Sequence, residues 1–200
     1  MALADLLDAF ASTDAVPGGG SAAAVAGALG ASLLLMVAGM TKTKSGAPEE
    51  TADLADAAAR LRPVRDTLIA LIDRDSNAYR GVMTAFKRPK GSEQEQSARA
   101  RAIDDATRAA TDAPLDTMRA CQQALGGAVV VARNGNPNAS SDVAVAIELL
   151  LSALRGARVN VDVNLKGLAD ASYVTDVTLE CDALQRDALA DAERARAQLR

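Results

Sequence analysis

The sequence predicts an all-α fold: a single-domain bundle of long antiparallel helices, extending over residues 1–200. Alanine dominates the composition, tryptophan is absent, and the chain holds only two tyrosines and two phenylalanines. A core of Ala, Val and Leu with so few aromatic rings favours close helix–helix packing over stacked sheets. The chain shows no internal repeat and no shift in composition, and its length suits one substantial core.

The composition also argues against several classes of function. The net charge of −4 comes from mixed signs without a basic stripe, so we expect no binding to nucleic acid. Because histidine is absent, we expect no His/Cys zinc site and no imidazole acid or base. Cys121 and Cys181 lie far apart, with no secretory leader ahead of them, so we expect reduced thiols and a cytoplasmic protein.

The first distinctive stretch is a proline–glycine loop. Residues 2–13 are expected to form a short amphipathic helix, and Val-Pro-Gly-Gly-Gly-Ser follows at 16–21. Pro17 favours a turn, the three glycines permit backbone angles closed to other residues, and Ser21 is a good N-cap. Such a loop presents unpaired N–H groups at a helix start, which suit an anion or a polar heterocycle. A plain turn before a core helix is the alternative.

The loop leads into an uncharged helix, expected over residues 21–41. Residues 15–41 carry no charge and are long enough to span a bilayer, but they are mostly Ala, Gly and Ser, and amphipathic helices follow them. We therefore predict a buried central helix and no membrane association. Small residues recur every four positions along it, which lets other backbones approach closely. Lys42 and Lys44 lie at or just past its last turn, where cations are favoured.

A second long helix is expected from Pro48 to about Phe86. Apolar residues mark a heptad seam along it, and position 75 of that seam is an aspartate. Burying a carboxylate on an apolar seam is costly unless the group is paired or used, so Asp75 is a candidate functional residue. A solvated edge of the helix is the alternative. Tyr79 lies one turn later on the same face and could hydrogen-bond to Asp75 or to a ligand.

A third long helix follows a basic break. Ser92 and Glu95 fit a capping box at its start. Pro114 predicts a kink, and Gly126-Gly127 is expected to loosen the helix before a short apolar run of valines. These valines could form a strand, but no partner strand is evident, so we predict that they are helical.

The second polar cluster is the loop at 133–142, Arg-Asn-Gly-Asn-Pro-Asn-Ala-Ser-Ser-Asp. Its asparagines, glycine and proline indicate a structured loop, and its serines are expected to cap a central apolar helix over 142–157. Asp142 lies in the first turn of that helix, where a carboxylate complements the helix dipole.

Two further helical segments are expected after this one. Residues 159–165 place Asn160 and Asn164 one helical turn apart on the same face. An amphipathic helix from about Val174 closes the chain and is expected to pack on the outside of the bundle.

Four segments of the chain together carry a family resemblance. They are PGGGSAAAVAGALGASLLLMVAGMT at 17–41, DSNAYRGV at 75–82, GNPNASSDVAVA at 135–146 and ARVNVDVNL at 157–165. In these motifs and their order, the sequence resembles the C-terminal domain family of formiminotransferase-cyclodeaminases. The region after Thr41 departs from the family pattern, which leaves both Lys42 and Lys44 open as its basic residue.

The resemblance implies a cyclodeaminase-like homodimer that binds tetrahydrofolate in a cleft lined by these polar segments. The residues expected to bind the substrate are Pro17, Gly18, Gly19, Gly20, Ser21, Tyr79, Asn136, Asn138, Asn160 and Asn164. Asp75 falls on an aspartate of the family pattern. We expect Asp142, or Asp75 if it is buried, to act as acid and base. Lys42 or Lys44 would hold a folate carboxylate or polarise the reacting centre.

The resemblance also implies a folate-dependent one-carbon enzyme, with two reactions open. The first is conversion of 5-formimidoyltetrahydrofolate to 5,10-methenyltetrahydrofolate with release of ammonia. The alternative is hydrolysis of 5,10-methenyltetrahydrofolate to 10-formyltetrahydrofolate. Both need proton transfer and a carboxylate near a cationic carbon; neither needs a metal or redox cofactor, because tetrahydrofolate itself carries the reacting group. A non-catalytic helical binding or scaffold module is a further alternative.

Overall fold

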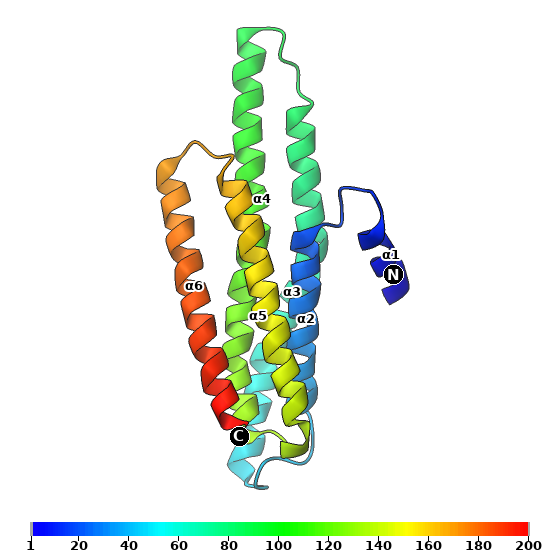
Figure 1. Cartoon of the computed structure of the whole chain (residues 1–200), viewed down its shortest axis with the longest axis vertical. Coiled ribbons are helices and arrows are strands. Elements are labelled where there is room, and N and C mark those ends of the chain that lie inside the picture. The colour runs from blue at the N-terminus through cyan, green and yellow to red at the C-terminus, as the bar shows by residue number, and fades with distance from the viewer. Residues whose placement is uncertain (1, 200) are drawn as a thin grey trace.

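The computed structural model describes residues 2–199, which contain only helices and loops. The helices are α1 (Leu3–Ala11), α2 (Gly19–Ala38), α3 (Pro48–Phe86), α4 (Glu93–Asn134), a 3₁₀ turn (Pro137–Ala139), α5 (Ser140–Leu165) and α6 (Ala171–Gln198). From α2 to α6, successive helices alternate in direction and pack into an elongated bundle (Figure 1). The predicted all-α antiparallel bundle is therefore confirmed.

Helix α2 packs against α3, α4 and α5, and α4 packs against these helices and α6. The glycines of α2 bring the neighbouring helices close. A Cβ atom on Gly30 would lie 2.8 Å from Leu150 Cγ, and one on Gly27 would lie 3.0 Å from Cys121 Sγ. By length and composition α2 could cross a membrane, but 56% of its most apolar stretch is buried inside the bundle. The expected small-residue core helix is thus present.

Two helix starts agree with the residues that signal them. Pro48 is the first residue of α3, where its missing N–H leaves no helical hydrogen bond unmade. Ser92 Oγ accepts a hydrogen bond from Glu95 N at 3.2 Å, and Glu95 Oε2 accepts one from Ser92 N at 3.0 Å. This is the capping box predicted for the start of α4.

Two local predictions are wrong because packing overrides the preference of the residue. Helix α2 begins two residues before Ser21, with Gly18 at its N-cap, and Ser21 is instead buried against α3. The pair Gly126-Gly127 does not loosen α4, which continues unbroken to Asn134. A Cβ atom on Gly127 would lie 3.0 Å from Leu61 Cδ2, so this glycine admits a side chain of α3.

The two helices predicted over 142–157 and 159–165 are one helix, α5. The N-cap of α5 is Ala139, and no side chain caps it, so the predicted serine cap is also wrong. Ala157 and Val161 are buried on one stripe that runs through the predicted break. This shared apolar face keeps the helix continuous.

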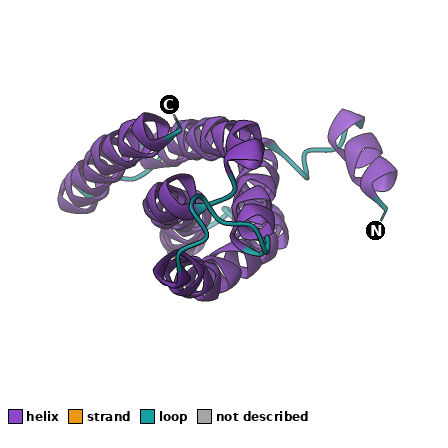
Figure 2. Cartoon of the chain, turned by 90° about the horizontal axis from the view of Figure 1, so that it is seen from below, coloured by secondary structure: helices purple, strands orange, loops and turns teal. Residues whose placement is uncertain are grey.

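Helix α1 stands apart from the bundle (Figures 1 and 2). It has the predicted amphipathic pattern, but none of its residues is buried, and Leu3 and Leu7 are 69% and 58% exposed. Residues 12–18 connect it to the start of α2. Most of the apolar face of α1 therefore has no partner among residues 2–199.

Glu50 holds the turn between α2 and α3. Its carboxylate accepts hydrogen bonds from Thr43 Oγ1 at 2.7 Å, Ser45 N at 2.9 Å and Gly46 N at 3.1 Å. These bonds, of which the one from Thr43 is the largest cause, lower the pKa of Glu50 from 4.5 to about 2. The contribution of this group to stability is thus complete above pH 4.5 and is lost as the pH falls through about 2.

We expect Glu50→Gln to lower the free energy of unfolding at neutral pH and to flatten its decline between pH 4.5 and 2. Urea unfolding followed by circular dichroism across this range measures both effects. Glu49→Gln is the matched control, because Glu49 is the exposed neighbour in the same first turn of α3. Equal acid sensitivity of the two variants would contradict this role of Glu50.

Candidate functional site

A cavity of about 290 Å³ opens where the start of α2 meets α3, α4 and the end of α5. It is lined by Ala15, Val16, Gly18, Gly19, Gly20, Asp75, Tyr79, Val82, Thr107, Ala110, Asn160 and Asn164. The structure thus brings together the glycine loop, the aspartate–tyrosine pair of α3 and the asparagine pair of α5. Pro17 lies between the lining residues Val16 and Gly18, and the buried Ser21 hydrogen-bonds to Asp75. Thr107 and Ala110 of α4 also line the cavity, and neither was predicted as a site residue.

Asp75 lies directly over the first turn of α2. A Cβ atom on Gly20 would lie 2.2 Å from Asp75 Oδ1, so only glycine leaves room for this carboxylate. Ser21 Oγ donates to the carbonyl oxygen of Ile72 at 2.8 Å and to Asp75 Oδ2 at 3.0 Å. It also shares a 3.2 Å hydrogen bond with Ser76 Oγ. The unpaired N–H groups of the first helical turn favour a negative charge at this place.

Both asparagines of α5 have their amide nitrogens bound to backbone carbonyls. Asn160 Nδ2 donates to Gly156 O at 2.9 Å, and Asn164 Nδ2 donates to Ala110 O of α4 at 2.8 Å. Among residues 2–199, none donates a hydrogen bond to Oδ1 of either side chain. Both Oδ1 atoms therefore remain available as acceptors. With the Asp75 carboxylate, they suit a ligand that carries N–H donors or positive charge.

The other predicted site residues lie at the opposite end of the bundle. Asn136 lines a separate cavity of about 220 Å³ with Lys44, and Asn136 Oδ1 accepts a hydrogen bond from Asn138 N at 3.0 Å. Asp142 is in the first turn of α5, eighteen residues before Asn160. At 1.5 Å per residue, this spacing places them about 27 Å apart. Within one chain, the predicted site residues therefore form two separate groups, one at each end of the bundle, and not the single pocket expected from the sequence.

The two candidate lysines lie with this second group. Lys44 Nζ donates to the carbonyl oxygen of Gln198 at 3.1 Å, at the carboxyl end of α6, where a cation is favoured. Lys42 is exposed on the loop that follows α2. Because the 20 residues of α2 span about 30 Å, neither lysine reaches a reacting centre beside Asp75 of the same chain.

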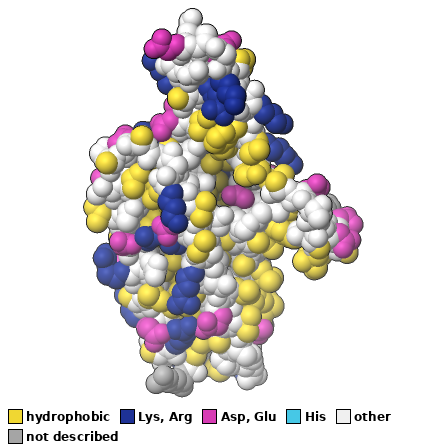
Figure 3. Space-filling view, turned by 45° about the horizontal axis from the view of Figure 1, so that its top comes forward, with side chains coloured by type: hydrophobic (Ala, Val, Ile, Leu, Met, Phe, Trp, Pro, Cys, Tyr) yellow, Lys and Arg dark blue, Asp and Glu magenta, His cyan; other side chains and the backbone are white. Residues whose placement is uncertain are grey.

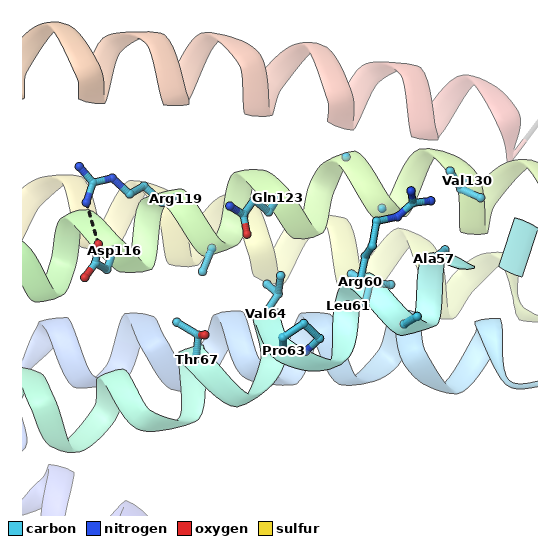
Figure 4. A pocket seen from close by; sticks show the side chains of 14 residues that line it. Ala57, Arg60, Leu61, Pro63, Val64, Thr67, Asp116, Arg119, Gln123 and Val130 are labelled. Atoms are coloured by element: carbon cyan, nitrogen blue, oxygen red, sulfur yellow. Dashed lines mark hydrogen bonds and ion pairs between the residues drawn. The ribbon is translucent and has the colours of Figure 1, made fainter. Parts of the chain in front are cut away.

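A larger cavity, of about 950 Å³, lies between α3 and α4 and contains none of the predicted site residues (Figure 4). Its polar side chains include Asp116 and Arg119, which pair with each other at 2.7 Å. Arg119 also binds Glu180 of α6 at 2.6 Å. Most of the other residues that line this groove are apolar and none belongs to the polar motifs of the sequence, so we place the candidate site at the Asp75 cavity.

Neither metal nor thiol chemistry is indicated within residues 2–199. No cluster of three or more Asp, Glu, Cys and His side chains in this range could hold a metal ion. Both cysteines are buried and unpaired by disulfides, and burial raises the pKa of the Cys121 thiol to about 12. A thiol with so high a pKa is a poor nucleophile. The candidate chemistry therefore rests on Asp75 and the polar groups around it.

The fold and the cavity define an all-helical protein with one carboxylate held at the head of a glycine-rich helix. The sequence profile of the formiminotransferase-cyclodeaminase family matches residues 2–183. The chain belongs to this family, and the resemblance seen in its motifs is confirmed.

Three known proteins show how close the relation is. A methenyltetrahydrofolate cyclohydrolase from Methylorubrum extorquens is 40% identical over 188 residues, which are 94% of this chain and 90% of that protein. A formimidoyltransferase-cyclodeaminase from Gallus gallus is 32% identical, covering 82% of this chain but 30% of that protein. A solved structure of a formiminotetrahydrofolate cyclodeaminase from Thermotoga maritima matches with a TM-score of 0.88 and 26% identity. That match covers 100% of this chain and 96% of the other.

The contact between Gly20 and Asp75 can be tested by its effect on stability. Gly20→Ala would place a methyl group 2.2 Å from Asp75 Oδ1, so the carboxylate must rotate away or the helices must separate. We expect a net loss of about 0.5–2 kcal/mol in the free energy of unfolding, because overpacking costs about 1–3 kcal/mol and alanine is favoured over glycine in a helix by about 0.5–1 kcal/mol. Urea unfolding measures it.

Gly81→Ala provides the matched control for this variant, because a Cβ atom there meets nothing within 4 Å. An alanine in the middle of a helix is favoured over glycine by about 0.5–1 kcal/mol, so this control should be stabilised. Wild-type stability in Gly20→Ala would contradict the close contact with Asp75.

Proposed function

We propose that this chain is a folate-dependent one-carbon enzyme that hydrolyses 5,10-methenyltetrahydrofolate to 10-formyltetrahydrofolate. The cyclohydrolase from Methylorubrum extorquens supports this reaction, because the match extends over 90% of that protein. The match to the Gallus gallus cyclodeaminase supports deamination less, because the chain spans only 30% of that longer protein. The order of the two reactions favoured by the sequence alone is therefore reversed.

The observation that carries the proposal is the set of acceptors in the Asp75 cavity. The carboxylate of Asp75 and the free Oδ1 atoms of Asn160 and Asn164 all offer lone pairs there. A reduced pterin presents several N–H donors, and its methenyl carbon belongs to a cationic amidinium between N5 and N10. The cavity therefore complements this substrate in both hydrogen bonding and charge.

In the proposed hydrolysis, the Asp75 carboxylate stabilises the amidinium cation and accepts a proton from the attacking water. The water oxygen bonds to the methenyl carbon and gives a neutral tetrahedral adduct. The bond from this carbon to N5 then breaks, and N5 takes the proton from Asp75. The hydroxyl proton leaves to solvent, and the carbon remains on N10 as a formyl group. Ser21 keeps the carboxylate in place throughout.

Deamination of 5-formimidoyltetrahydrofolate is the second candidate, because the Thermotoga maritima cyclodeaminase shares the fold over the whole chain. In that reaction N10 attacks the formimidoyl carbon, and ammonia leaves as the same carboxylate moves the protons.

One assay separates the candidates. Purified protein is mixed with 5,10-methenyltetrahydrofolate in one cuvette and with 5-formimidoyltetrahydrofolate in another, and the methenyl chromophore is followed. We expect loss of the chromophore in the first cuvette. A gain in the second cuvette, with release of ammonia, would instead identify a cyclodeaminase. No change above the uncatalysed rate in either cuvette would leave a non-catalytic binding module.

Asp75→Asn is expected to lower turnover by about 10²-fold or more, the scale of an acid/base group, without unfolding the protein. Asp142→Asn is the comparison, because within one chain Asp142 is about 27 Å from the Asn160 side of the cavity. A similar loss of turnover in Asp142→Asn would support the homodimer inferred below, in which a second copy brings this residue to the cavity, and wild-type turnover would argue against that arrangement. Wild-type turnover in Asp75→Asn would eliminate Asp75 as the acid and base.

We infer further that the protein acts as a homodimer. Besides the apolar face of α1, the outer face of α2 and α5 is uncovered within residues 2–199. It carries Leu29, Met36, Val145 and Val159, which are between 44% and 61% exposed. Figure 3 shows hydrophobic side chains on the surface beside the protruding α1. Two copies related by a two-fold axis can cover both surfaces at once.

The separation of the predicted site residues into two distant groups also favours a homodimer. The Asp75 cavity, at about 290 Å³, is just below the range of roughly 300–1,000 Å³ for ligand pockets. A two-fold axis crossing α5 near its middle would bring the Asp142 end of one copy beside the Asn160 end of the other. The two groups would then combine into two composite sites.

Gel filtration with light scattering measures the assembly. We expect twice the mass of the 20.5 kDa chain. Leu7→Asp should weaken the dimer, because it places a charge on the apolar face of α1. Leu179→Asp of α6 is the control, because this leucine is similarly exposed, at 62%, but lies on another face. A monomeric wild-type protein would contradict the inference.

A further inference from the structure

Two long helices contain an internal proline, and the two prolines differ in the fate of the carbonyl that each sets free. Proline has no N–H, so the carbonyl four residues earlier loses its helical hydrogen bond. Pro63 in α3 frees the carbonyl of Ala59, and Pro114 in α4 frees the carbonyl of Ala110.

The carbonyl freed by Pro114 binds a side chain of the candidate site. Asn164 Nδ2 donates to the Ala110 carbonyl oxygen at 2.8 Å, across the contact between α4 and α5. Pro114 is buried, and Ala110 lines the same cavity as Asp75. The bond therefore joins the proline-interrupted turn of α4 to a residue at the wall of the cavity.

The carbonyl freed by Pro63 has no such role. Ala59 and Pro63 line the large groove between α3 and α4, away from the Asp75 cavity (Figure 4). Among residues 2–199, no side chain donates a hydrogen bond to the Ala59 carbonyl. The chain thus contains two equivalent backbone defects, of which only one supports the candidate site.

We propose that Pro114 is a positioning residue, which frees the Ala110 carbonyl so that Asn164 is held with Oδ1 available to the substrate. An asparagine amide can turn over and exchange its donor for its acceptor. Binding of Nδ2 to Ala110 fixes one orientation and leaves Oδ1 as the atom offered to an N–H group. The identity of that N–H group, on a reduced pterin, rests on the proposed function.

In Pro114→Ala the N–H of residue 114 returns and competes with Asn164 for the Ala110 carbonyl. The amide of Asn164 then loses its fixed orientation, and binding of the pterin N–H weakens. We expect KM for 5,10-methenyltetrahydrofolate to rise about three- to tenfold, the range for one hydrogen bond. We expect kcat to change little, because the contact is made in both the ground state and the transition state. The melting temperature should not fall, because alanine suits a helix interior far better than proline.

Pro63→Ala is the matched control. It removes the same kind of residue from inside another long helix, at a carbonyl that holds no side chain. Because Pro63 is exposed and Pro114 is buried, we compare the two variants by KM alone, and we expect Pro63→Ala to leave KM unchanged. An equal rise of KM in Pro63→Ala and Pro114→Ala would contradict a positioning role for Pro114.

A double-mutant cycle tests whether the effect passes through Asn164. In the Asn164→Ala background, Pro114→Ala should raise KM no further, because the side chain that it positions is gone. An equal rise in both backgrounds overturns the proposal, as does a wild-type KM in Pro114→Ala.

A second readout needs no substrate. The side-chain NH₂ signals of Asn164 can be identified in nitrogen–proton correlation spectra by their absence from Asn164→Ala. They should shift in Pro114→Ala and stay in place in Pro63→Ala. Signals that stay in place in both variants overturn the proposal. If the wild-type protein turns over neither folate, the proposed function fails, while these spectra still decide whether Pro114 holds Asn164.

Discussion

The stacking of Asp75 over Gly20 is the contact on which the candidate site depends. Because a Cβ atom at this position would lie 2.2 Å from the carboxylate oxygen, α3 can bring Asp75 to the head of α2 only over a glycine. Ser21 then binds both the carboxylate and the backbone of α3. Two adjacent residues thus supply the space and the hydrogen bond that fix one charged group.

The same close packing continues along α2, so that residues of four helices can line one small cavity. Gly27 and Gly30 admit side chains of α4 and α5 to within 3.0 Å of the place where a Cβ would lie. Larger residues at these positions would push the neighbouring axes outward, because interaxial distance follows the side chains at the contact. Asp75, Ala110 and Asn164 would then no longer share a wall.

The sequence predicts much of this arrangement, and its failures have physical causes. Pro48 and the Ser92 capping box act through their own turn of helix, so their effects can be inferred locally. Ser21 acts through a helix 51 residues away, and no local pattern shows that contact. The apolar stripe through Val161 likewise joins two predicted helices through packing with the rest of the bundle.

For the site, the heptad seam identified Asp75 and helical spacing identified the asparagine pair, because both depend on a single helix. The position of the Asp142 group could not be predicted in this way. A chain that alternates in direction can place consecutive polar segments at either end of the bundle, and the motif order does not say which. The bond from Asn164 to Ala110 has a sequence signal in Pro114, but its partner is found only in three dimensions.

The linker between α1 and α2 could couple dimerisation to ligand binding. Ala15 and Val16 of this linker line the Asp75 cavity, so the segment that carries α1 forms part of the cavity wall. In a homodimer that holds α1 in place, pairing of the chains and binding of a ligand would share one coupling free energy. By reciprocity, a ligand that favours the ordered wall would tighten the pair, and dilution of the protein would lower the specific activity of each chain.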